Sequence, residues 1–354
     1  MKINKKVLIA MSGGVDSSVV AAILKNKYSK VVGAFMINYD TAENGEQGTC
    51  YINDYRDAVR VAAKLNIELL KLDFKKEYKK NVLDYMYEEY KKGKTPNPDV
   101  MCNKYIKFGF WLEKAKELGF DYLATGHYAK IDKNKQEFFL EKAKDENKDQ
   151  TYFLHQLNQD QLKYTLFPIG KYTKKQVRKL AKKFDLPTAE KEESMGICFV
   201  GEVDMKKFLT DKIKNKKGSI ILENGEKIGE HDGLSFYTIG QRHGFEQIGG
   251  TKALFVLKKD FENNLLIVGE ENSELLYKKE IELENIHFIS EKEIKFPLKC
   301  DVRLRHRQKL QKAVLNKENN CFILKFNKKQ KAITPGQFAV FYKGNYCLGG
   351  GAIK

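Results

Sequence analysis

The order of apolar and amphipathic segments in the first 130 residues limits the possible folds of this chain most strongly. Four short runs have the composition of buried strands: KVLIAM, VVGAFM, IELLKLD and FDYLATG. Longer segments with helical periodicity separate them: SSVVAAILKNKY, NDYRDAVRVAAKLN, KKEYKKNVLDYMYEEYKK and YIKFGFWLEKAKELG. This alternation predicts an α/β fold, a doubly wound parallel sheet with helices on its faces. Such sheets bind ligands at the carboxyl ends of their strands.

The first predicted strand continues directly into the string SGGVDSS and then into a helix. Backbone amides at a helix N-terminus can hold phosphate groups. The string is not a Walker loop, because the GxxxxGK[ST] spacing and its lysine are missing. A generic glycine turn is the alternative. In its strand–turn–helix context, however, the string resembles the pyrophosphatase loop (PP-loop) of N-type ATP enzymes, which cleave ATP between its α and β phosphates and leave AMP on a substrate oxygen.

The second half of the chain has a different residue pattern and predicts different secondary structure. Residues 150–186 look helical, with a break at Pro168 and Gly170, and the basic segment that follows the break could track a nucleic-acid backbone or simply be a solvated face. From about Gly218 the chain changes to short strands and Asn/Gly turns, which predict a small β-rich linker domain and then a β-barrel. We expect domain boundaries at 1–205, 206–274 and 275–354.

The net charge of +17 favours a polyanionic partner such as nucleic acid, although a lysine-rich composition alone could produce it. Arginine is rare in this chain, and three arginines lie in DVRLRHRQ. Alternation on a strand would place Arg303, Arg305 and Arg307 on one face. Such a stripe suits either phosphate binding or a salt-bridged barrel surface, and the residues alone do not separate the two.

Cysteine spacing and hydropathy exclude several classes of protein. The six cysteines, at 50, 102, 198, 300, 321 and 347, form no CxxC pair, which argues against a zinc ribbon or a disulfide scaffold. No apolar run reaches the length of a membrane span, and residues 7–11 are too short for a secretory signal. We therefore expect a cytoplasmic protein without a membrane partner.

The stretch TPNPDVMCN presents a carboxylate and a thiol near a helix start. Pro96 and Pro98 hold the chain around Asn97 extended, and Asp99 and Cys102 follow three residues apart. Helix-start amides would lower the pKa of a thiol and favour thiolate. Alternatively, Asp99 is an ordinary N-cap and Cys102 a packed core residue.

Motifs along the whole chain, in order, resemble the tRNA-specific 2-thiouridylases of the MnmA type. The matching strings are MSGGVDSS, TPNPDVMCN, IKFG, ATGHYA, KDQTYFL, LFPIGKYTKKQVR, GICFVGE, GEHDGLSFYTIGQRHG, TPGQFAVFY and CLGGG. The resemblance implies a tRNA-uridine 2-sulfurtransferase in which ATP, with Mg2+, adenylates O2 of the wobble uridine in tRNAs for Lys, Glu and Gln. Persulfide sulfur, supplied by a cysteine desulfurase or a sulfur-relay protein, then displaces AMP.

The same resemblance assigns roles to individual residues. It makes Cys198 the persulfide carrier, Asp99 a general acid/base, and Cys102 the thiol that frees hydrosulfide or forms a disulfide with Cys198. The nucleotide would contact Ala10, Met11, Ser12, Gly13, Gly14, Val15, Asp16, Ser17, Met36 and Gly126. The flipped uridine and the rest of the tRNA would contact Asn97, Pro98, Asp99, His127, Lys148, Asp149, Gln150, Arg305, His306 and Gln337. The resemblance favours RNA as the partner of the arginines, leaves the other histidines without a role, and leaves Cys300, Cys321 and Cys347 as core residues.

Alternatives remain open at this stage. Cys50, Cys102 and Cys198 could together hold an iron–sulfur cluster, which we favour less than the persulfide route, and we assign no other metal site. A different PP-loop enzyme would adenylate a carboxylate or base of a small metabolite. An RNA-binding protein with a decayed ATP site is a third possibility, against which the intact SGGVDSS argues. Members of the resembled family often have threonine where this chain has Met195.

Overall fold

The computed structural model describes residues 1–39, 50–192, 205–210, 212–213, 216–245, 252–319 and 321–354. Its first part contains a five-stranded sheet of order β3-β2-β1-β4-β7 in which all neighbouring strands are parallel. The strands are β1 Ile3–Met11, β2 Tyr28–Ile37, β3 Leu69–Asp73, β4 Tyr122–Ala124 and β7 Thr165–Leu166. The predicted parallel sheet is therefore confirmed.

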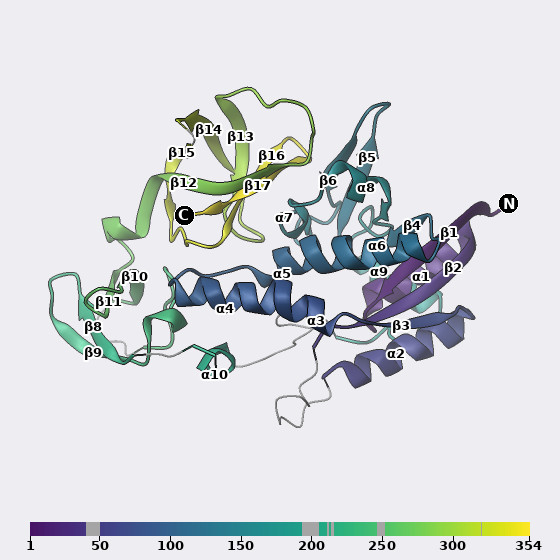
Figure 1. Cartoon of the computed structure of the whole chain (residues 1–354), viewed down its shortest axis with the longest axis horizontal. Helices are drawn as coiled ribbons and strands as arrows, with labels where there is room; N and C mark the ends of the chain where they lie inside the picture. The colour runs from purple at the N-terminus through teal and green to yellow at the C-terminus, as the bar shows by residue number, and fades with distance from the viewer. Residues whose placement is uncertain (40–49, 193–204, 211, 214–215, 246–251, 320) are drawn as a thin grey trace.

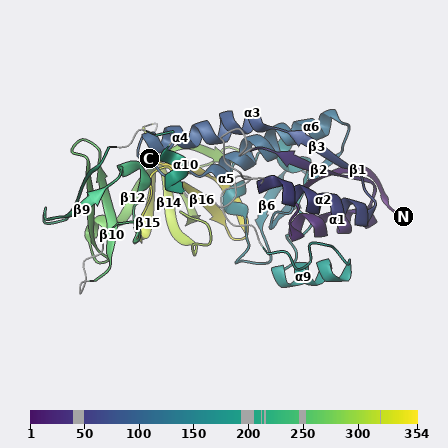
Figure 2. The same ribbon diagram turned by 90° about the horizontal axis from the view of Figure 1, so that it is seen from below.

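Helices cover both faces of this sheet because successive side chains of β1 point to opposite sides. Val7, Ile9 and Met11 pack with one layer, while Leu8 and Ala10 pack with the other. The first layer is formed by α1 Val15–Lys27, α2 Cys50–Leu65 and α9 Lys174–Lys183. The second layer contains two long helices. One runs from α3 Lys75–Tyr78 through η2 Lys79–Leu83 into α4 Asp84–Lys91. The other runs from α5 Pro98–Met101 through η3 Cys102–Trp111 into α6 Leu112–Glu117. Figure 2 shows α9 along one edge of the molecule and α3 and α4 along the opposite edge.

Residues 150–186 are less helical than the sequence predicts. They form α7 Thr151–Leu154, α8 Gln159–Lys163, the edge strand β7 and α9. The basic helix α9 begins with a complete capping box, in which the Thr173 side chain accepts from the Gln176 backbone and the Gln176 side chain accepts from the Thr173 backbone. This local signal fixes where α9 starts.

A small antiparallel and parallel sheet of order β10-β11-β8-β9 follows the short helix α10 Met205–Thr210. Its strands are β8 Gly218–Leu222, β9 Lys227–His231, β10 Leu254–Asp260 and β11 Leu265–Glu270, with the 3-10 turn η4 Leu234–Phe236 after β9. The sheet lies beyond the end of α4 (Figure 1), where the Phe261 ring packs so closely on Gly93 that a Cβ there would lie 2.2 Å from it.

The C-terminal part is an antiparallel six-stranded barrel, as predicted, closed by pairing of its first and last strands. After η5 Glu274–Leu276, the strands are β12 Tyr277–Phe288, β13 Leu298–Arg303, β14 Gln311–Glu318, β15 Cys321–Lys331, β16 Phe338–Lys343 and β17 Tyr346–Ile353. A hairpin of the first part, β5 Ala129–Lys133 and β6 Phe138–Lys142, extends this sheet, because Leu140 pairs with Cys347 and Glu141 with Tyr346. The sequence did not predict this hairpin, which joins the α/β unit to the barrel (Figure 1).

Two expectations about the barrel are wrong. Strand β13 ends at Arg303, and Arg305 and Arg307 lie in the turn that follows, with Arg307 at φ 62°. The three arginines therefore do not share a strand face: Arg303 is buried, whereas Arg305 and Arg307 are exposed. Cys321 is exposed rather than part of the core, whereas Cys300 and Cys347 are buried as expected. Within the described part of the chain, the helices are all too short or too polar to cross a membrane.

Candidate active site

The turn between β1 and α1 is built to present backbone amides. Gly13 has φ +71°, and a Cβ on it would lie 2.1 Å from the Asp54 carbonyl oxygen, so a side chain at this position would clash with the start of α2. Gly14 is the N-cap of α1 and supplies no side-chain cap, which leaves the first amides of the helix available to a ligand. The Ser17 hydroxyl accepts from the Ser12 amide (3.2 Å) and donates to the Gly14 carbonyl (3.1 Å), which fixes the loop.

The turn after β4 closes one side of this loop. A Cβ on Gly126 would lie 3.1 Å from the Ser17 amide nitrogen, so glycine leaves room there that another residue would fill. Strands β4 and β2 flank β1 on opposite sides, and Met36, near the carboxyl end of β2, is 1% exposed. The predicted nucleotide residues thus gather at the carboxyl ends of three adjacent parallel strands, where the strand order of the sheet reverses. The bare helix start and the glycine-lined space fit the phosphates of ATP.

Two residues that the sequence did not single out complete this region. Lys174 places its Nζ 2.8 and 2.9 Å from the two carboxylate oxygens of Asp16, and the Tyr128 hydroxyl donates to Asp16 Oδ1 at 2.9 Å. Lys174 is the first residue of α9, so the Thr173 capping box that starts the helix also positions the lysine. The capping pattern in YTKKQV was the available signal, but its approach to Asp16 depends on tertiary packing.

His127 follows directly in the same turn and is only 8% exposed. Its Nδ1 lies 2.7 Å from the Thr125 hydroxyl, and its ring packs against Phe108 and Phe167. Burial, with a smaller contribution from the Lys107 charge, holds the pKa of His127 well below its usual range. The imidazole is therefore neutral at physiological pH and can orient a substrate by hydrogen bonding without acting as a cation.

The TPNPD segment is clamped to the barrel. The Gln337 amide donates to the carbonyls of Thr95 (3.0 Å) and Pro96 (3.1 Å), and its Oε1 accepts from Asn97 Nδ2 (3.1 Å). The Tyr152 hydroxyl reaches the Leu304 and Phe338 carbonyls at 3.3 and 3.2 Å. Asn97 and Gln337, predicted separately as substrate-binding residues, are thus direct neighbours from opposite ends of the chain.

The N-cap of α5 is Asn97, whose side chain accepts from the Val100 amide at 3.2 Å, so the alternative in which Asp99 caps this helix is wrong. Asp99 lies half-buried in the first turn, after Pro98. Cys102, one turn later, is 0% exposed and sits in the core with Ala10 and Met36. Cys198, together with the side chain of Cys50, lies outside the described residues.

The predicted tRNA-contacting turn, residues 148–150, contains two half-buried side chains and one buried side chain. Lys148 and Gln150 are half-buried, and Gln150 Oε1 accepts from the Tyr128 amide at 2.9 Å. Asp149 is 2% exposed; its carboxylate accepts from the Ala143 amide and pairs with buried Arg303. These bonds hold the turn against the barrel, and the predicted contact of Asp149 with tRNA stays a prediction.

The other predicted tRNA residues lie beside this turn. His306 packs on the Phe153 ring with centroids 4.7 Å apart. Burial is the main cause that lowers the pKa of His306 to about 4, so the ring is neutral near pH 7. Arg305 is exposed and donates to the Lys331 and Ala332 carbonyls at 3.0 and 3.3 Å.

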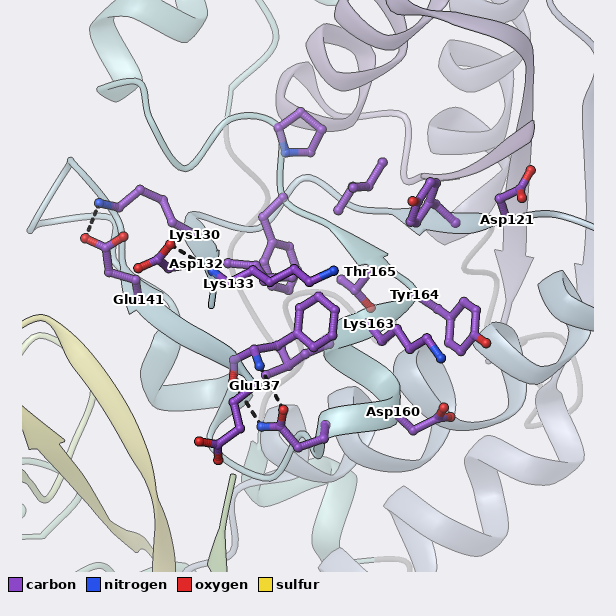
Figure 3. Close-up of a pocket in the computed structure, with 18 of the residues that line it drawn as sticks. Asp121, Lys130, Asp132, Lys133, Glu137, Glu141, Asp160, Lys163, Tyr164 and Thr165 are labelled. Atoms are coloured by element: carbon purple, nitrogen blue, oxygen red, sulfur yellow. Dashed lines mark hydrogen bonds and ion pairs between the residues drawn. The ribbon is translucent and has the colours of Figure 1, made fainter. Parts of the chain in front are cut away.

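No group of three or more His, Cys, Asp or Glu side chains gathers to hold a metal ion among the described residues. A groove of about 1370 Å³ lies away from the phosphate loop, near the amino ends of the parallel strands (Figure 3). It is lined by Lys5, Tyr28, Asp121 and Tyr122 among others. Its position excludes it as the site of the nucleotide chemistry, which depends on the amides of the phosphate loop.

Comparisons with known proteins cover the whole chain. Residues 5–202 match the tRNA methyl transferase HUP domain family, residues 206–270 the tRNA methyl transferase PRC-barrel domain, and residues 278–353 the aminomethyltransferase beta-barrel domain. The tRNA-specific 2-thiouridylase MnmA of Listeria monocytogenes is 46% identical over 98% of this chain and 94% of its own length. The protein of the same name from Alkaliphilus oremlandii is 47% identical over 99% of this chain and 97% of its own.

Among solved structures, the U34-tRNA thiolase NcsA from Methanococcus maripaludis with its [4Fe-4S] cluster is 20% identical, with a TM-score of 0.37 over 59% of this chain and 64% of that one. That likeness is too distant to carry a conclusion about cofactors. Two findings decide the family. The curated relatives are similar over nearly the full length, and the HUP domain family matches residues 5–202, more than half of the chain. The chain belongs to the MnmA family of tRNA-specific 2-thiouridylases.

Proposed function

We propose that this protein uses ATP to convert the wobble uridine of tRNAs for Lys, Glu and Gln into 2-thiouridine. One observation carries the proposal: a turn that presents uncapped helix amides, a cysteine near a helix start and a loop clamped by the barrel occur together in one chain of this family. The curated relatives carry the name tRNA-specific 2-thiouridylase. A sulfur-donor protein, a cysteine desulfurase or a relay protein, completes the system.

In the first step the uridine O2 attacks the α phosphate of ATP, pyrophosphate leaves, and AMP becomes bonded to O2. The amides of residues 12–17 and the Lys174 ammonium would hold the phosphates, because they supply positive potential at one point. Mg2+ would bind mainly through the phosphate oxygens, since Asp16 is already paired with Lys174. The Asn97 segment would hold the flipped base.

In the second step the terminal sulfur of a persulfide on Cys198 attacks C2, and AMP leaves with the former O2. The thiolate of Cys102 then attacks the inner sulfur of Cys198, so that the sulfur–sulfur bond breaks, 2-thiouridine is released and a Cys102–Cys198 disulfide remains for a cellular thiol to reduce. Alternatively, Cys102 releases hydrosulfide first, and the hydrosulfide attacks C2. Asp99 would carry the proton that the base loses or gains.

The burial of Cys102 adds a requirement to this scheme. Its side chain is 0% exposed, so sulfur must come to it from a group of the protein and not from free solution. The clamp between Gln337 and Thr95 is a contact through which the barrel and bound tRNA would position the segment that leads into Cys102.

The test is an assay of purified protein with unmodified tRNA, ATP and Mg2+, with either sulfide or a cysteine desulfurase plus cysteine as sulfur source. We expect pyrophosphate release only with a suitable tRNA and 2-thiouridine in the nucleoside digest. Cys198→Ser should abolish thiolation from the desulfurase. Pyrophosphate release without tRNA, stimulated by a small metabolite, would instead support a metabolic ligase.

A further inference from the structure

A cavity of about 350 Å³ lies between the hairpin, the turn before α7 and the barrel, and the nucleotide and uridine chemistry does not use it. Its lining is mostly cationic: Lys130, Lys142, Lys144, Lys171 and Arg303, against the carboxylates of Glu146 and Asp149. The Asp149 charge is already neutralised by Arg303. The cavity therefore carries an excess of positive charge.

Arg303 gives this cavity a fixed positive charge. Its side chain is 9% exposed and pairs with Asp149 through Nη1, which holds the guanidinium in place at the cavity wall. A planar guanidinium suits the recognition of a phosphate group.

The lysines around the cavity are not satisfied by carboxylates. Of the four lysines that line it, Lys130 pairs with Glu141 at 2.6 Å, but Lys142, Lys144 and Lys171 form no ion pair within the described residues. Backbone bonds fix the segments that carry them: the Lys142 amide donates to Asn345 and the Lys144 amide to Gly170, at 2.8 and 2.9 Å. Three lysines without an ion pair among the described residues thus line the cavity on segments that backbone bonds hold in place, together with the carboxylate of Glu146.

The cavity adjoins the groove of Figure 3, because Lys130 and Lys171 line both. In the groove the carboxylates are largely neutralised, for example Asp121 by Lys5 at 2.7 Å. Lys133 and Lys163 form no ion pair in the described part of the chain, and each lies over an aromatic ring, Phe138 at 5.0 Å and Tyr164 at 5.2 Å. Figure 3 shows Lys133 extending across the groove, apart from the Lys130–Glu141 pair. Cations interleaved with aromatic rings are typical of nucleic-acid surfaces.

We propose that the cavity and the groove form one basic track that binds the sugar–phosphate backbone of the tRNA outside the anticodon loop, with the cavity holding one phosphate beside Arg303. The inference rests on the proposed function, because that function supplies the tRNA. The composition of the track favours RNA over an acidic protein. Its cations are mostly lysines, some of them stacked on aromatic rings, whereas lysine is depleted at protein–protein interfaces.

The experiment measures binding of an unmodified tRNA transcript by the full chain over a range of KCl concentrations. The variant is K142Q/K144Q/K171Q. The control K76Q/K80Q removes two exposed lysines from the continuous helix α3–η2, which lies along the edge opposite α9 (Figure 2). The tRNA association constant K falls as salt rises, and each lost phosphate contact should make the plot of log K against log salt less steep by about 0.7 to 0.9. We expect the triple variant to bind tRNA at least about tenfold more weakly at physiological salt, with its slope reduced by about two, and the control to change much less.

A charge-preserving variant, K142R/K144R/K171R, should bind tRNA like wild type, and thermal unfolding of all variants shows whether they fold. Wild-type affinity and salt slope in the glutamine variant would overturn the track. A second outcome would also overturn it: the glutamine variant binds tRNA normally and thiolates it with sulfide, but not with a desulfurase as the sulfur source. The track would then bind the donor protein. Failure of the wild-type protein to thiolate tRNA from sulfide tests the proposed function separately, since binding is measured without turnover.

Discussion

Burial decides the chemical state of the key side chains in this protein. Cys102 is 0% exposed, and His127 and His306 are kept neutral mainly by desolvation. The sequence indicated these positions through motifs, but it could not indicate burial, which depends on how the TPNPD segment packs under the barrel. Asp99 shows the same limit: it looked suitable as a helix cap, yet Asn97, two residues earlier, has the required extended backbone and caps the helix.

Cys102 should react slowly with an alkylating reagent in the native protein. Exposed Cys321 provides an internal reference on the same chain. We expect iodoacetamide to modify Cys102 about tenfold or more slowly than Cys321, because reaction requires local opening, and to modify both readily in urea. Mass spectrometry of peptides, with Cys321→Ser to verify the assignment, measures this. Equal native rates would contradict the burial of Cys102.

His155 should make the protein sensitive to acid. Its Nδ1 donates to the Tyr152 carbonyl (2.7 Å), and burial is the main cause that lowers its pKa to about 3. Between about pH 6.5 and pH 3 the unfolded chain binds a proton at this residue that the folded chain does not, so the free energy of unfolding falls as the pH is lowered.

His155→Gln removes this titration. The slope of unfolding free energy against pH between 6 and 4.5 should become shallower by up to about 1.4 kcal/mol per pH unit, as measured by urea unfolding. His243→Gln, at an exposed position, is the control. An unchanged slope in His155→Gln would show that other groups cause the acid sensitivity.

Among the secondary-structure elements, apolar strands were the easiest to predict. β1 and β2 are buried on both faces and therefore appear as continuous apolar runs. The hairpin β5–β6 was missed because AKIDKNKQEFFLEK mixes charged residues into both strands, and its apolar side chains are buried only through pairing with a strand more than 200 positions later. The arginine stripe failed for a related reason, since alternation cannot reveal that β13 stops at Arg303.

Helix α9 places Lys174, its first residue, beside Asp16. Lys174→Met should lower kcat/KM for ATP at least about tenfold, because the Asp16 carboxylate would then lie uncompensated beside the bound phosphates. Exposed Lys175→Met, next to it on α9, is the matched control. Pyrophosphate release under saturating tRNA measures the effect, and equal values for the two variants would remove Lys174 from the nucleotide site.

In the whole molecule, apolar, polar and sheet contacts all join the α/β unit to the barrel. One buried apolar cluster contains Leu140 and Leu154 of the first part together with Val340 of the barrel. The buried Asp149–Arg303 pair connects the turn before α7 to β13, Gln337 connects the barrel to the TPNPD segment, and β6 pairs with β17. The family resemblance assigned Asp149 and Gln337 to tRNA binding, which stays a prediction, but a single sequence could not show that both side chains also join the two parts of the chain.

Breaking the Asp149–Arg303 pair from one side should destabilise the protein strongly. Asp149→Ala or Arg303→Leu should each cost about 3–5 kcal/mol of unfolding free energy, because a buried charge is left without its partner. The double variant should lose less than the sum of the two. Denaturant unfolding of all four proteins measures the coupling, and additive losses would mean that the two charges do not interact.

The shared sheet also bears on how the protein is made. During synthesis β6 leaves the ribosome long before its partner β17 Tyr346–Ile353. Until β17 has been made, the hairpin keeps an unpaired edge, and such edges recruit other chains. The charged residues of β5 and β6, which hid the hairpin in the sequence, are the kind that protect a waiting edge from aggregation.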